Sequence, residues 1–392
     1  MTFWENRIKR DITFFYTDGV EYQTAQPIAE EATRRGFRVR FSKNIFQKAE
    51  IGVYCQHRCF PECSKFSMVM LHDLAQGHNR WPNIWIGEPW NKFDIAILPG
   101  DSWVERWQEC SWDPFVRPRI GVFKLGWPKA DLVFESEDRF RRESASFRKE
   151  LGLIHHNSVI YAPSWENDGK QDEFVQALKD LPVNLLLKQA PWAPKYQHII
   201  ENIRLMNEKH RDCGKNVKII DSNISIMRCL GLANIIVSEE SSVMFEGLLF
   251  DIPSIAVTDW LIPDCAPPRP PSVPFDFIRK VSKSGLRNAV IEMLETLESH
   301  KQALRDYRNR NFAFLGESSK RIVSLLECCI EGQSLEVSPE TPSKELQPLS
   351  VRRKFQAIRH SIQKLFFKAI RSKEWFIRIL RTFHDNLKKW TR

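Results

Sequence analysis

Short runs of apolar, often β-branched residues alternate along the chain with longer stretches in which apolar residues recur every three or four positions. Runs of the first kind are typical of buried strands, and stretches of the second kind of helices that bury one face. Thr24–Arg35 is such a helical stretch, and it ends at Gly36, a residue favoured just after a helix. Strands alternating with helices predict βαβ units on a parallel sheet. The strand-like runs of the first half are Asp11–Tyr16, Phe37–Phe41, Ile51–Cys55, Ser67–Leu71, Asp94–Leu98 and Ile120–Lys124.

A second series of the same kind follows the charged helical stretch Asp138–Leu151. Its strand-like runs are Ser158–Tyr161, Val183–Leu187, Val217–Ile220, Asn234–Val237 and Ser254–Val257. Two successive α/β halves of similar size predict two Rossmann-like domains facing a cleft, an arrangement known as GT-B. A single large sheet is the competing interpretation of the same pattern.

The length of 392 residues suits two domains and an appendage. We expect an N-terminal, acceptor-binding domain over residues 1–135 and a C-terminal, donor-binding domain with closing helices over residues 136–331. Between Pro263 and Pro274 the chain has six prolines, which exclude a helix or central strand and predict a loop near the cleft. Residues 332–350 are rich in Ser, Pro and Glu and are interpreted as a linker to a tail over residues 351–392.

The net charge of +9 is concentrated in this tail. Val351–Arg392 holds thirteen Lys or Arg residues against two acids, so the tail carries +11 and the remainder −2. A nearly neutral body argues against a broad nucleic-acid surface. Nine cysteines, irregularly spaced and without an export signal, favour reduced thiols. The spacing of Cys55, His57, Cys59 and Cys63 fits no usual metal motif, so we expect no metal site.

The tail also has a helical apolar face, which includes Phe355, Ile358, Ile362 and Leu365. A basic amphipathic helix with aromatic residues on its apolar side predicts an anchor on an anionic membrane surface. Packing against the body or a partner, and nucleic-acid binding, are the alternatives. Because no apolar run reaches 18 residues and no secretory leader is evident, we expect a cytoplasmic protein, peripheral on the inner face of the cell membrane.

The clearest candidate for ligand binding is the end of the run Asn234–Val237. After Ser238 come two glutamates and then Ser241 and Ser242, at the expected start of a helix. Free backbone N–H groups, the helix dipole and two hydroxyls could together hold a phosphate. An ordinary serine N-cap, which needs only one hydroxyl, explains the same residues equally well.

Four segments, in this order along the chain, resemble the CDP-glycerol glycerophosphotransferase family, which builds teichoic-acid-like polymers. They are Gly126–Asp131 (GWPKAD), Tyr161–Trp165 (YAPSW), Asp221 and Ser238–Ser242 (SEESS). The resemblance spans roughly residues 67–257 and implies a GT-B fold, and we expect no cofactor. It also implies that Ser241 and Ser242 hold the activated donor, together with Ser164 and with Glu239, which stands where the family has an aspartate.

The chain departs from the family pattern at two places. The family's His-Gly pair, proposed as the base, falls here at Gln76-Gly77, so that His72 or His78 would take that role. Each could equally be an ordinary loop histidine. The family's Lys-x-His-Pro run becomes Lys188-Gln189-Ala190-Pro191. Lys188 could still bind a phosphate, or be a surface lysine at a strand end.

Glu246 lies one turn after Ser242. Resemblance to nucleotide-sugar enzymes of the GT-B type implies that it accepts hydrogen bonds from a ribose, and a dipole-favoured glutamate is the alternative. The leading hypothesis is transfer of a glycerol-phosphate or similar polyol-phosphate unit from a CDP-linked donor to a membrane-associated, lipid-linked glycan. A glycosyltransferase using a nucleotide sugar and a non-catalytic membrane-surface assembly factor remain alternatives.

Overall fold

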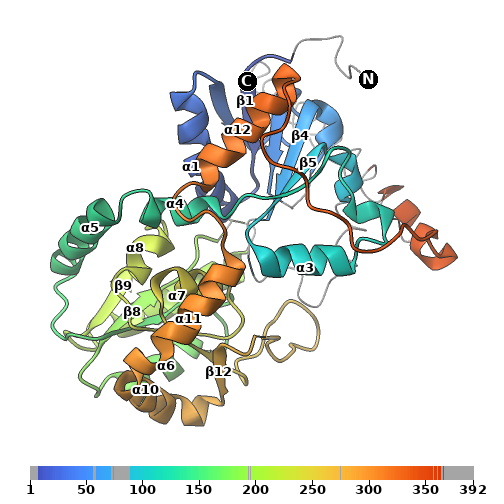
Figure 1. Ribbon diagram of the computed structural model, residues 1–392. Coiled ribbons are helices and arrows are strands. Elements are labelled where there is room, and N and C mark those ends of the chain that lie inside the picture. The colour runs from blue at the N-terminus through green and yellow to red at the C-terminus, as the bar shows by residue number, and fades with distance from the viewer. Residues whose placement is uncertain are drawn as a thin grey trace, which may run out of the picture.

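The computed structural model describes residues 8–55, 59–71, 74, 89–192, 194, 196–273, 275–355, 357–359, 361–362 and 365. It contains two separate six-stranded parallel sheets with helices packed around them (Figure 1). The predicted strands near Ser67 and Asn234 fall in different sheets, which confirms the two-domain α/β prediction and excludes a single large sheet. Within the described residues, no helix is both long and apolar enough to cross a membrane.

The first sheet has the strand order β2-β1-β3-β4-β5-β6. Its strands are β1 (Asp11–Phe15), β2 (Arg38–Ser42), β3 (Ala49–Tyr54), β4 (Ser64–Met70), β5 (Ile95–Leu98) and β6 (Gly121–Lys124). The central strands are buried on both faces, as near-continuous apolar runs require in a parallel sheet. The helices of this domain are α1 (Gly19–Arg34), α3 (Asp101–Glu109), α4 (Pro128–Phe134) and α12 (Ser318–Glu331).

Helix α1 begins five residues before the predicted Thr24 because of a capping box. The Asp18 carboxylate accepts hydrogen bonds from the N–H groups of Val20 and Glu21, both at 3.0 Å. The Glu21 carboxylate in turn accepts one from the Asp18 N–H at 3.4 Å. These two acids satisfy N–H groups that the first turn of a helix leaves without partners.

The second sheet has the order β12-β11-β10-β7-β8-β9. Its strands are β7 (Ser158–Tyr161), β8 (Asn184–Lys188), β9 (Val217–Ile220), β10 (Ile235–Ser238), β11 (Ser254–Val257) and β12 (Ile278–Val281). The pattern analysis missed β12, an edge strand whose two central residues are exposed and charged. The surrounding helices are α5 (Glu137–Glu150), α6 (Lys170–Leu178), α7 (Gln197–His210), α8 (Ile226–Leu230), α9 (Val243–Glu246), the 3₁₀ helix η4 (Gly247–Phe250), α10 (Leu286–Glu295) and α11 (Leu297–Asn311).

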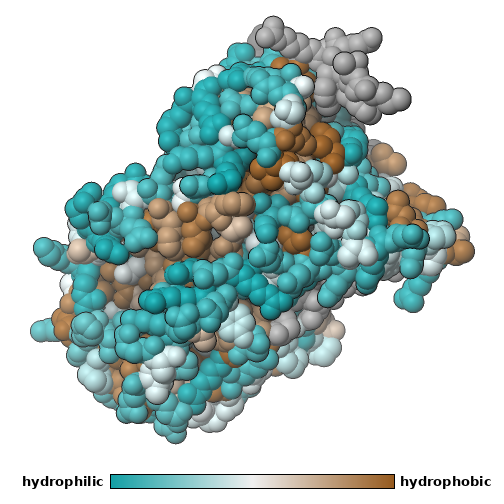
Figure 2. All heavy atoms as spheres, viewed as in Figure 1, coloured by the Kyte–Doolittle hydropathy of each residue, from teal (hydrophilic) through white to brown (hydrophobic). Residues whose placement is uncertain are grey.

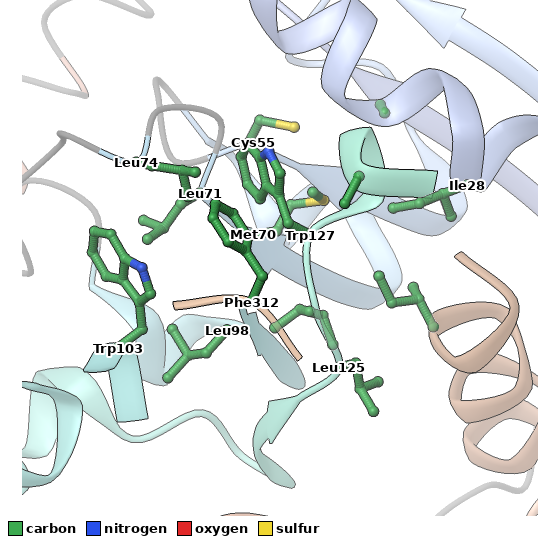
Figure 3. Close-up of a cluster of buried hydrophobic side chains, with 14 of the residues drawn as sticks. Ile28, Cys55, Met70, Leu71, Leu74, Leu98, Trp103, Leu125, Trp127 and Phe312 are labelled. Atoms are coloured by element: carbon green, nitrogen blue, oxygen red, sulfur yellow. The ribbon is translucent and has the colours of Figure 1, made fainter. Parts of the chain in front are cut away.

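The apolar core is continuous between the two domains. Val159 and Tyr161 of β7 point into a core confined to one face of the second sheet. Ile160, between them, joins the core that also fills the first domain, as strand alternation requires. Figure 3 shows part of that shared core, where Phe312 lies among Leu98, Trp103 and Trp127.

The chain crosses between the domains twice, and both crossings lie side by side. It leaves the first domain through Gly126 and α4, and it returns through residues 311–317 to α12, which packs on α1 and α4 (Figure 1). The buried Asp131 carboxylate of α4 accepts hydrogen bonds from the N–H groups of Ser318 and Ser319, at 3.0 and 2.7 Å. Asp131 therefore caps α12, a helix expected from the sequence to close the C-terminal domain.

Residues 332–350, which we call the strap, contain neither helix nor strand but are bound along the first domain. The Glu340 N–H donates to the Val122 carbonyl of β6 at 2.8 Å, and the Gln347 N–H to the Trp112 carbonyl at 2.8 Å. Strand β6 is the edge of its sheet. The strap thus covers part of an edge whose open backbone groups could otherwise pair with another chain.

We expect Gly126→Ala to lower the free energy of unfolding by about 3 kcal/mol or more. Gly126 has a φ of +93°, and a Cβ there would lie 2.2 Å from the Ser318 hydroxyl and 2.3 Å from the Ala313 carbonyl. Gly36→Ala is the matched control, because its φ of +81° is similar and its surroundings are open. It should cost about 1 kcal/mol. Urea denaturation measures both, and equal costs would show that the crossing tolerates a side chain.

Candidate active site

The carboxyl ends of the strands of both sheets meet where the domains face each other. A Cβ placed on Gly19, after β1, would lie 3.4 Å from Cγ of Pro191, after β8. In the second sheet, successive strands run outward from β7 to β9 on one side and from β10 to β12 on the other. Ligands of such sheets bind in the crevice where the order reverses, here between the ends of β7 and β10. The predicted donor residues Ser164, Glu239, Ser241 and Ser242 lie in the segments that follow these two strands.

Glu239 spans the crevice from the end of β10 to the loop after β7. Its carboxylate is fully buried and accepts hydrogen bonds from the N–H and hydroxyl of Ser164, at 3.1 and 3.0 Å. It also accepts bonds from the Trp165 N–H at 2.9 Å and the Lys170 ammonium at 3.3 Å. With the Ser238 hydroxyl, which donates at 3.0 Å, five donors surround its two oxygens. The structure therefore places Glu239 so that it fixes the loop carrying Ser164, and contact of either residue with a donor stays a prediction.

Ser241 and Ser242 are half-buried residues immediately before α9. The Ser241 hydroxyl accepts a hydrogen bond from the Val243 N–H at 3.3 Å, whereas Ser242, the N-cap residue, makes no side-chain cap bond. The helix that follows is short, because α9 is a single turn that continues as the 3₁₀ helix η4. A helix dipole needs several aligned peptide units, so the hydroxyls and N–H groups matter more than a dipole does.

Glu246 is paired across the domain junction with Lys129 of α4. The Lys129 ammonium donates to the Glu246 carboxylate at 2.5 Å, and both side chains are only 4% exposed. The contact between Lys129 and Glu246 could not be predicted from the sequence, because the two residues are 117 positions apart. A ribose-binding role for Glu246 stays a prediction, and it would have to coexist with this ion pair.

Lys188 is a buried cation whose ammonium contacts carbonyl groups. It donates to the carbonyls of Gln189 and Ser222 at 2.8 and 2.9 Å, and the side chain is buried. In the described part of the chain, no carboxylate lies within ion-pair distance of its Nζ. Burial lowers the pKa of Lys188, although the nearby Cys229 and Asp221 oppose that shift. The alternative of a surface lysine at a strand end is therefore wrong.

Three features of this region were missed from the sequence. Half-buried aromatic rings gather after β7 and β8, with centroid distances of 4.8 Å for Trp165–Trp192 and 5.0 Å for Trp192–Tyr196. The proline-rich loop is held by Arg269, whose guanidinium makes bonds of 2.8 and 2.7 Å with Glu240, beside Ser241. These residues come together only in the folded protein, so the pattern of apolar residues along the sequence could not predict their contacts.

The third missed feature is a buried carboxylate, Glu166, in the loop after β7. It accepts hydrogen bonds from the Tyr161 hydroxyl at 2.6 Å and the Gln189 amide at 2.8 Å. Burial raises the pKa of Glu166. Because Gln189 directly follows Lys188, this network fixes the loops after β7 and β8 relative to each other.

The two histidines predicted as candidate bases, His72 and His78, lie outside the described residues. They follow β4, whose carboxyl end belongs to the same edge of the first sheet as the ends of β1 and β5. Their role as a base stays a prediction. Among the residues that the structure describes, no group of three or more His, Cys, Asp or Glu side chains could hold a metal ion.

Comparison with known proteins shows a structural likeness and no sequence relative. No family model matches the chain, and no curated protein matches it. A variant of the wall teichoic acid polymerase TagF soaked with CDPG is 13% identical, with a TM-score of 0.58, covering 84% of this chain and 91% of that chain. Another TagF variant is 16% identical, with a TM-score of 0.56, covering 84% and 90%. At this identity the likeness establishes a shared GT-B fold.

We expect Lys129→Met and Glu246→Gln each to lower the free energy of unfolding by about 3–5 kcal/mol, because each leaves a buried charge without its partner. The double variant Lys129→Met/Glu246→Leu should recover most of that loss. Glu201→Gln, which removes an exposed pair with Arg204, is the control and should leave the stability almost unchanged, because solvent screens that pair. Urea denaturation tests all four. Full stability of Glu246→Gln would mean that the pair does not support the junction.

Proposed function

We propose that the chain is a transferase that moves a glycerol-phosphate or similar polyol-phosphate unit from a CDP-linked donor to a membrane-associated glycan acceptor. The product would be a cell-surface polymer of the teichoic-acid type. The observation that carries the proposal is Lys188, a buried cation without a carboxylate partner among the described residues, near the crevice of the second sheet. A buried charge is costly unless it is compensated, and a pyrophosphate would compensate it.

The proposed chemistry is a displacement at phosphorus. A histidine after β4, His72 or His78, takes the proton of the acceptor hydroxyl, and the oxygen attacks the β-phosphate of the donor. The new O–P bond forms as the bond to the leaving CMP breaks. Lys188 and the hydroxyls of Ser241 and Ser242 stabilise the charge on the pyrophosphate, while Glu239 keeps Ser164 and its loop in place.

Two other functions use the same fold. A glycosyltransferase with a nucleotide-sugar donor would place Glu246 on the ribose, and the present ion pair with Lys129 weighs against that role. A non-catalytic assembly factor at the membrane surface would explain why the family's Lys-x-His-Pro run has lost its histidine.

A panel of nucleotides tests the donor. We expect CDP-glycerol or CDP-ribitol to raise the melting temperature of the protein more than UDP- or GDP-sugars do, because a bound ligand stabilises the folded state. Ser241→Ala/Ser242→Ala should weaken that binding by about 2–4 kcal/mol through two lost charge-assisted hydrogen bonds. Calorimetry measures the affinity. A response to UDP-sugars alone would favour the glycosyltransferase, and no response at all would favour the assembly factor.

We also propose that the tail binds the anionic inner face of the cell membrane. In its described part, Val351, Phe355, Ile358 and Ile362 recur at helical spacing, and each is more than half exposed. Such a face, on a tail with thirteen basic residues, matches the apolar interior and negative headgroups of a bilayer. The apolar face argues against nucleic acid as the partner.

Deleting residues 355–392 should abolish pelleting with vesicles that contain phosphatidylglycerol but leave nucleotide binding intact. Full-length binding should weaken with salt without vanishing, because salt screens charge but not insertion of the apolar face. Ile358→Gln/Ile362→Gln, which leaves the charge unchanged, should weaken pelleting at every salt concentration. A full-length protein that ignores such vesicles at low salt would contradict the membrane proposal.

A further inference from the structure

The tail is fastened to the first domain at its first turn. The Asp113 carboxylate is completely buried, and the guanidinium of Arg353 binds it through Nε at 3.2 Å and also through its second terminal nitrogen. Arg353 lies over the ring of Trp112, 5.7 Å from the centroid. A charge-assisted contact of this kind is stronger than a hydrogen bond between neutral groups. We call this pair the latch.

The strap leads to the latch along a continuous set of hydrogen bonds with the first domain. The Gln108 amide donates to the Thr341 carbonyl at 3.0 Å, and the Lys344 N–H donates to the Ser111 hydroxyl at 3.0 Å. Arg117 donates to the Lys344 carbonyl at 2.6 Å. The strap therefore offers little slack between the body and the tail helix.

The tail helix begins at the latch itself. The Ser350 hydroxyl accepts a hydrogen bond from the Arg353 N–H at 3.3 Å, which is the geometry of an N-cap. Arg353 points to the body, while the apolar residues Val351, Phe355 and Ile358 remain exposed. Figure 2 shows apolar side chains of this segment gathered at the right-hand edge of the molecule, where Figure 1 draws the tail beside the first domain.

We infer that the tail helix and the first domain bind an anionic bilayer as one rigid surface, with the latch between Arg353 and Asp113 fixing the orientation of the body. This inference rests on the proposed membrane association of the tail. A flexible tether would allow the body to tumble above the lipid. The latch instead holds the loop 111–119 and the strap next to the headgroups, so that the domain expected to receive the acceptor stays at a constant height above the membrane.

Hydrogen exchange of the full-length protein, with and without vesicles of equal parts phosphatidylglycerol and phosphatidylcholine, tests the inference. On vesicles, amides of the tail helix and of the loop 111–119 and strap should gain protection together. Arg353→Gln and Asp113→Asn should still pellet, but the loop and strap should lose that gain and exchange at least about tenfold faster than in the wild type. Arg352→Gln is the matched control, because it removes the same charge from the neighbouring, exposed position.

Each result has one meaning. Protection confined to the tail helix in the wild type would overturn the rigid surface and leave a tether. If the loop and strap remain protected in Arg353→Gln, the latch does not fix the orientation of the body. Arg353→Gln alone is sufficient for this test, even if Asp113→Asn does not fold. Absence of pelleting would refute the membrane association itself. In that case hydrogen exchange without vesicles, compared between the wild type and Arg353→Gln, still shows whether Arg353 keeps the strap bound to the first domain.

Discussion

Residues 126–131 make contacts with both domains, and the arrangement of the two domains depends on these contacts. Gly126 adopts a positive φ and has no side chain, so the returning chain can approach it closely at Ala313 and Ser318. Three residues later Lys129 reaches into the second domain, and Asp131 caps the helix that comes back from it. Burial raises the pKa of Asp131, but the N–H groups that it accepts from oppose that rise.

Shared burial at this junction limits how the domains can move. A GT-B cleft is often pictured as two bodies joined by a hinge, yet here one apolar cluster includes side chains of both sheets. Opening the cleft at the junction would expose part of that cluster and separate the Lys129–Glu246 pair. The loops after β7 and β10 are also tied to each other, through the Glu239 carboxylate, so this side of the cleft is held in place as well.

The sequence was most informative where local pattern decides the outcome. Runs such as Ser254–Val257 became strands with the expected bounds, because a strand buried on both faces needs a continuous apolar run. Strand β12 was missed because exposed Arg279 and Lys280 break that run at a sheet edge. The end of β10 at Ser238 and the start of α9 were predicted because a strand-to-helix turn has a local signature. The partners of Glu239, Glu246 and Asp113 were not, since each lies at least 69 positions away and only the tertiary fold defines it.

The strap also constrains how the protein is made. Synthesis proceeds from the N-terminus, and domains usually fold in that order as they emerge. Here the first domain cannot finish until α12 and the strap have been translated, long after its six strands. During that interval β6 has a bare edge and α1 lacks its covering helix, while the second domain can already fold. The growing chain therefore leaves this sheet edge uncovered until late in translation, and a premature stop before the strap would leave it exposed permanently.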